Sequence, residues 1–70
     1  MNELINFLNQ VYAQSEKATS TRDRWTFFAQ AFGAVRFFQQ LRPELDDKIL
    51  TLWETKYYDK FMELWISSAN

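Results

Sequence analysis

The scarcity of chain-breaking residues is the feature that most constrains this fold. Gly33 and Pro43 are the only glycine and the only proline among 70 residues. Folds built from strands and tight turns need many such residues, because glycine and proline supply the backbone angles of turns. Apolar residues recur instead at helical spacing in three segments. The sequence therefore predicts an all-α protein, a small three-helix bundle that forms one helical domain over residues 1–70.

The first expected helix covers about residues 2–16. Its apolar positions recur at intervals of three and four, which places them on one face with polar residues opposite. They are Leu4, Ile5, Phe7, Leu8, Val11 and Tyr12. Asn2 is the expected N-cap, and Glu3 lies in the first turn, where negative charge favours the helix dipole.

The second expected helix covers about residues 21–41 and is unusually aromatic. Ser20 followed by Asp23 resembles a capping box with Asp in place of Glu or Gln. At about 100° per residue, apolar side chains cover roughly 200° of this helix, where a one-sided helix shows a stripe from about 100° upward. We therefore expect most of its aromatic residues to be buried between two other helices. Phe37 is the exception, because it falls on the polar side.

The third expected helix covers about residues 43–67. The residue before a proline avoids α-helical geometry, so Pro43 ends the second helix and suits the first position of the next. The apolar stripe of this helix turns by about 100° after Trp53. A regular helix drifts by only about 20° per seven residues. The helix is therefore expected either to break near residues 54–56 or to change its packing partner there.

Composition excludes several kinds of chemistry. The chain has no cysteine and no histidine, which rules out disulfides, thiolate nucleophiles and the usual zinc sites. Glu44, Asp46 and Asp47 lack the spacing and the glycine of a calcium-binding EF-hand loop, so we interpret them as compensating the helix dipole. We expect no catalytic residue, no metal ligand and no cofactor, and hence a protein that is not an enzyme.

Charge and hydropathy set expectations about location and partners. Residues 1–42 carry a net charge of +2 and residues 43–70 carry −3, which gives −1 for the chain. This balance lacks the strong basic patch of a protein whose main partner is nucleic acid. No apolar stretch reaches the length of a membrane span, and the start of the sequence has no secretory signal. We therefore expect a cytoplasmic protein.

Protein–protein contact, with a homodimer as its simplest form, is the expected function. Gly33 could let another backbone approach beside Phe37, and the end of the third helix extends beyond the reach of the first. The candidate interface residues are Gly33, Phe37, Tyr57, Tyr58, Phe61, Met62, Trp65 and Ile66. The alternatives are ordinary core positions, notably for Phe61 and Trp65, and a Phe37 that is covered by the first helix or simply exposed.

Arg36 lies at the border of the apolar arc of the second helix. A desolvated arginine needs a carboxylate partner, and the third helix offers Glu54, Asp59 and Glu63. Alternatively, Arg36 lays its stem on aromatic rings and keeps its charge in water. Two other functions remain open. One is a regulator or inhibitor that binds a larger enzyme or nucleoprotein, and the other is a nucleic-acid-associated protein.

Overall fold

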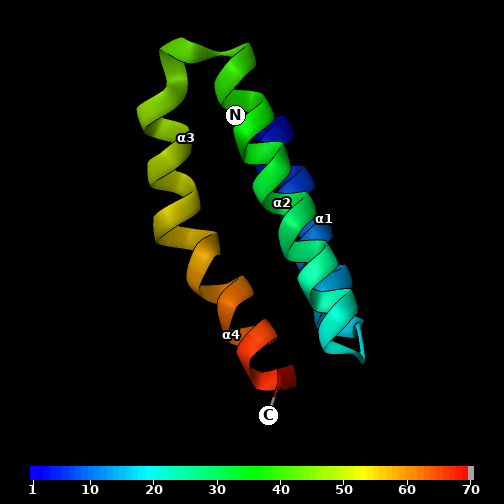
Figure 1. Ribbon diagram of the computed structural model, residues 1–70. Coiled ribbons are helices and arrows are strands. Elements are labelled where there is room, and N and C mark those ends of the chain that lie inside the picture. The colour runs from blue at the N-terminus through cyan, green and yellow to red at the C-terminus, as the bar shows by residue number, and fades with distance from the viewer. Residues whose placement is uncertain (70) are drawn as a thin grey trace.

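The chain folds as a three-helix bundle, as the sequence predicts (Figure 1). The structure, a computed structural model, describes residues 1–69. It describes their side chains except those of Trp65 and residues 67–69. Its elements are α1 (Asn2–Lys17), α2 (Thr21–Leu41), η1 (Pro43–Leu45), α3 (Asp46–Leu52), η2 (Trp53–Tyr57) and α4 (Tyr58–Ala69). The last four follow one another without a gap, and we call them the C-terminal arm. Figure 1 shows α2 between this arm and α1.

The helix ends follow local chemistry with one exception. Ser20 caps α2, its side chain accepting a hydrogen bond from the backbone N–H of Asp23 at 3.1 Å. Arg42 leaves the helical region with φ −129° and ψ 69°, so that Pro43 opens η1 as predicted. The predicted cap at Asn2 is wrong. The helix begins at Asn2, as the predicted range has it, but Asn2 is already helical and Met1 is the N-cap, and the Met1 carbonyl accepts from the N–H of Ile5.

The C-terminal arm does not break but changes its winding where the sequence predicts an irregularity. Residues Trp53–Tyr57 form a π-helical segment, in which each N–H bonds five residues back. The buried residues Ile49, Trp53, Tyr57 and Phe61 are spaced four apart. On a regular α-helix three such steps overshoot by about 120°. The wider π turn absorbs part of this rotation and keeps the four side chains facing the core.

The packing partners of the arm also differ along its length. The α4 helix packs on both α1 and α2, whereas α3 packs mainly on α2. Of the two expected causes of the turned stripe, the break is therefore absent, whereas the change of packing partner is present together with the π segment.

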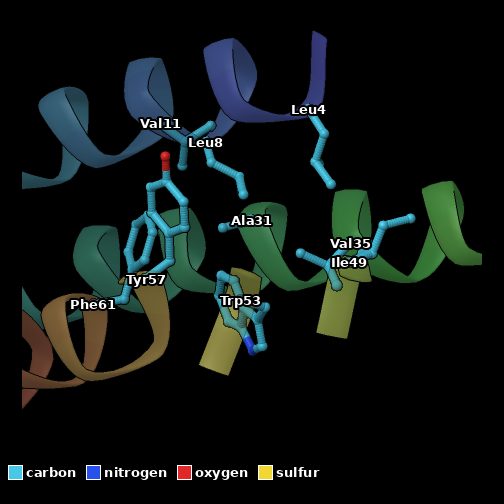
Figure 2. Close-up of a cluster of buried hydrophobic side chains, with 9 residues drawn as sticks. All are labelled: Leu4, Leu8, Val11, Ala31, Val35, Ile49, Trp53, Tyr57 and Phe61. Carbon is cyan, nitrogen blue, oxygen red and sulfur yellow. The ribbon is translucent and has the colours of Figure 1, made fainter. Parts of the chain in front are cut away.

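The core combines small residues from α2 with large ones from its two neighbours. Ala31 and Val35 are the buried residues of α2. Figure 2 shows Ala31 between Leu8 of α1 and Trp53 of the arm. Among the described side chains, the buried cluster consists of Leu4, Leu8, Val11, Ala31, Val35, Ile49, Trp53, Tyr57 and Phe61. Small side chains at the centre of α2 let the large aromatic rings of the arm come close to its axis.

Candidate protein-interaction surface

A connected cluster of aromatic rings joins α2 to the C-terminal arm. Phe28 lies at its centre, with Trp25 stacked at 5.6 Å between ring centroids and an interplanar angle of 16°. The rings of Trp53 and Tyr58 lie 5.9 Å and 6.2 Å from that of Phe28. Phe32 contacts Trp53 at 6.1 Å. These separations lie within the 4.5–7 Å at which aromatic pairs attract one another.

Three of these rings are large and open to solvent, and contacts through Phe28 and Trp53 connect them. Trp25, Phe32 and Tyr58 are 49%, 44% and 42% exposed, although Trp53 beneath them is buried. Scattered exposed apolar residues are normal, but a contiguous patch indicates an interaction surface. We call Trp25, Phe28, Phe32 and Tyr58 the aromatic face.

The border of the aromatic face along α2 is basic. Taking Trp25 as the reference on a helical wheel, Arg36, Ala29 and Arg22 lie about 20°, 40° and 60° beyond it, on the side away from Phe28. All three are exposed. The α2 border of the face therefore carries two arginines and a small residue between them.

The border along the C-terminal arm is acidic. Each residue that follows a buried one lies about 100° further round, on the side where Tyr58 is found. Glu54 follows buried Trp53 in this way, and Asp59 lies about 100° beyond Tyr58, towards the outer side of the arm; both are exposed. The residues that precede buried ones form the opposite flank, which carries the lysines Lys48, Lys56 and Lys60. The face thus has borders of opposite charge.

The structure does not bring Arg36 together with its expected partners within the chain. In the described residues no ion pair joins Arg36 to Glu54, Asp59 or Glu63, and the recorded pair is Arg42 with Glu44 at 3.0 Å. The reason is geometric, because Arg36 and Glu54 lie on opposite borders of the aromatic face. Arg36 instead lines a cleft of about 400 Å³ at the end of α2, which Asp46 also lines.

The expected interface residues at the end of the arm separate into two groups. Tyr58 and Ile66 are exposed and Met62 is half-buried, whereas Trp65 is outside the described side chains. Tyr57 and Phe61 are only 6% and 1% exposed, so their assignment to an intermolecular surface is corrected to core.

The π segment turns these two side chains towards α1. The Tyr57 hydroxyl donates to Asn9 Oδ1 at 2.7 Å, and the Phe61 ring lies nearly perpendicular to that of Tyr12, with 5.2 Å between ring centroids. Both side chains therefore stabilise the chain's own fold.

Phe37 and Gly33 lie on a different flank of α2. Phe37 is 56% exposed, so the first helix does not cover it. It lies about 120° round the helix from Trp25, outside the aromatic face. A Cβ atom added at Gly33 would meet none of the described residues within 4 Å. No close approach within the chain therefore requires a glycine there.

Sequence reasoning missed the exposure of Trp25, Phe32 and Leu41. It placed them in the buried arc of α2, but all three are exposed. They lie at the two edges of that arc, and the two neighbouring helices cover only its middle. Their positions at the edges of the arc are the sequence feature that could have indicated their exposure.

Arg24 is a second omission. Its Nε donates to the Ala18 carbonyl at 3.2 Å and its Nη1 to the Leu64 carbonyl at 3.1 Å. One side chain thus ties the α1–α2 connection to α4. The partners lie 6 and 40 residues away in sequence, and no motif predicts such a contact.

Two tyrosines have altered acidity because of packing. Burial raises the pKa of Tyr57 above its ordinary value. Burial also raises the pKa of Tyr12, with smaller contributions from Glu16 and Glu63. Lys60 Nζ lies 5.7 Å from the Tyr12 ring centroid, in cation–π range. The shift of Tyr57 follows from its burial in the core, and that of Tyr12 follows from its position between α1 and α4.

Searches for other kinds of site add two findings. The described side chains contain no group of three or more His, Cys, Asp or Glu residues placed to hold a metal ion. Among the described helices, none combines the length and the apolar character needed to cross a membrane.

Comparison with known proteins returns no relative. No protein-family model, curated protein or solved structure matches the chain.

Proposed function

We propose that this chain is a non-enzymatic protein-interaction module that forms a homodimer through its aromatic face. The observation that carries the proposal is the cluster of three exposed aromatic rings that half-buried Phe28 and buried Trp53 connect. Tryptophan and tyrosine are among the residues that most often anchor interfaces. Rings held by neighbouring rings also lose little conformational freedom on binding, which favours affinity.

The size of the molecule supports association through this face. The bundle measures 39 × 17 × 16 Å along its principal axes. An ordinary interface buries roughly 800 Å² per partner, which is about a sixth of the 4901 Å² of accessible surface of this chain. A chain of 70 residues also has a small core, and association is one of the usual ways in which such chains gain stability.

Sedimentation equilibrium at micromolar concentration tests the proposal. The wild-type chain should be a dimer, and Phe32→Gln should raise its dissociation constant about tenfold to a hundredfold. That range follows from about 1.5–3 kcal/mol for burying a phenylalanine, partial exposure in the free chain, and two copies per interface. Phe37→Gln is the matched control, because it makes the same change on the same helix outside the face. It should leave the constant unchanged.

Two results would overturn the proposal. One is a wild-type chain that is monomeric at about 100 µM, a concentration at which an ordinary specific dimer is assembled. The other is dissociation by Phe37→Gln with no effect of Phe32→Gln. Helical circular dichroism of both variants confirms that they remain folded. A folded monomer with a free aromatic face would direct attention to a larger protein as partner.

A further inference from the structure

We propose that the two copies are related by a two-fold axis parallel to α2, so that α2 of each lies against the C-terminal arm of the other. In this arrangement Arg36 of each copy meets Glu54 of the partner subunit. The inference rests on the proposed function, since it assumes that the aromatic face is buried in a homodimer. It adds the orientation of the partner and the residues that set it.

Charge complementarity selects this orientation. The α2 border of the face carries Arg22 and Arg36, and the arm border carries Glu54 and Asp59; all four are exposed. A two-fold axis parallel to α2 places the basic border of each copy on the acidic border of the other. Complementary potentials of this kind fix the register of an interface.

The competing two-fold arrangement brings like charges together. An axis across the face, perpendicular to α2 and passing near Ala29, would lay α2 on α2. Arg22 and Arg36 are equidistant from Ala29, seven residues on either side, so each would face the other arginine of the partner. The acidic borders would also face each other. Juxtaposed like charges disfavour this arrangement.

Arg36 and Glu54 lie at similar heights along the bundle axis, as the proposed pair between copies requires. Ring contacts set Phe28 beside Tyr58 and Phe32 beside Trp53. Because the two helices are antiparallel, one further turn of α2 brings Arg36 to the level of about residue 50. Glu54 is then about four residues, or roughly 6 Å, along the axis. An arginine side chain spans that offset once the two borders meet, which happens only between copies.

Charge reversal tests the pair in the intact chain by sedimentation equilibrium at low salt. Arg36→Glu and Glu54→Arg should each weaken the dimer about tenfold, because each places like charges in contact at two symmetric positions. The double variant should return to within about threefold of wild type. Lys56→Glu is the matched control on the opposite flank and should have no effect. Salt at about 0.5 M should shrink all these differences.

Cross-linking tests the orientation independently, since the chain has no native cysteine. Ala29 and Asp59 lie at the same level on opposite borders of the face. A mixture of Ala29→Cys and Asp59→Cys chains, treated with a short bis-maleimide, should give a covalent heterodimer, and Ala29→Cys chains alone should remain uncoupled.

The outcomes separate this inference from the proposed function. A dimer in which the double variant stays as weak as the single ones overturns the orientation alone. Efficient coupling of Ala29→Cys chains to each other also overturns it, because that result places α2 on α2. A monomeric wild-type chain overturns the proposed function and this inference with it.

Discussion

Ser15 on α1 is a buried polar residue whose hydroxyl has no hydrogen-bond partner in the described structure. It is 1% exposed, and its Oγ makes no recorded hydrogen bond. Leaving a buried polar group unsatisfied costs about 1–3 kcal/mol, and alanine is also a better helix former. Ser15→Ala should therefore raise the free energy of unfolding by about 1–2 kcal/mol, measured by urea denaturation at fixed protein concentration.

Ser20→Ala is the control, because it makes the same substitution but should change the free energy of unfolding in the opposite direction. Its side chain caps α2 by accepting the N–H of Asp23. Loss of such a cap costs about 1 kcal/mol, so Ser20→Ala should lower the unfolding free energy. If Ser15→Ala lowers it as well, the hydroxyl of Ser15 has a partner and the interpretation fails.

The two packed tyrosines predict an alkaline limit to stability. Burial raises the pKa of both Tyr12 and Tyr57 above the ordinary value of 10.0. Above pH 10 the unfolded chain loses these protons while the folded chain retains them, so stability is complete below pH 10 and falls as pH rises through the folded pKa values. Tyr12→Phe should flatten this decline in urea unfolding measured between pH 9 and pH 11. A decline as steep as that of wild type would contradict the assignment.

The π segment is the structural element whose role is most directly testable. Deletion of exposed Thr55 would change the spacing of the buried residues from four-four-four to four-three-four, which a regular α-helix keeps on one face. The variant should therefore fold with a continuous third helix. Its unfolding free energy should lie within about 1 kcal/mol of wild type, since π segments are kept more often for function than for stability.

Deletion of exposed Gln30 is the control for this experiment. It removes one residue from the regular helix α2 and rotates residues 21–29 by about 100° against residues 31–41. This change separates Phe28 from the direction of Ala31, so thermal melts followed by circular dichroism should show a large loss of stability. Equal damage in both deletion variants would mean that the core requires the π segment.

Arg24 connects two elements at one end of the bundle. It donates to the carbonyls of Ala18 and Leu64, and hydrogen bonds to charged groups contribute about 1.5–3 kcal/mol when well formed. Because the side chain is partly exposed, Arg24→Ala should lower stability by about 1.5 kcal/mol. It should also speed amide hydrogen exchange in α4. Lys17→Ala, which removes an exposed cation at the end of α1 and outside the aromatic face, should leave α4 protected.

At the scale of the whole molecule, the sequence predicts the elements better than the surface. The three helices, the Ser20 cap and the end of α2 before Pro43 follow from local chemistry. The turned stripe also locates the π segment, because one additional residue in a helix shifts its face by about 100°. These features depend on neighbours within a few positions, which a sequence displays directly.

The surface depends on where the neighbouring helices lie. Trp25 and Phe32 fit the periodicity of a buried stripe and yet remain exposed, because neighbouring helices cover less of α2 than its apolar arc spans. Tyr57 appears on the same stretch as Tyr58, and the π turn sends one to Asn9 and the other to solvent. Contacts between residues 48 apart are set by the assembled bundle and leave no local pattern.

Gly33→Ala tests which exposed flank of α2 forms the dimer interface, the aromatic face or the flank that carries Phe37. A glycine inside a helix costs about 1 kcal/mol relative to alanine, and a Cβ at this position meets none of the described residues within 4 Å. Gly33→Ala should therefore raise the unfolding free energy by about 1 kcal/mol, measured at fixed protein concentration because dimer stability depends on it. If the dimer forms through the aromatic face, its dissociation constant should change less than threefold. A tenfold weakening would instead place a second backbone against Gly33, and it would move the interface from the aromatic face to the flank that carries Phe37.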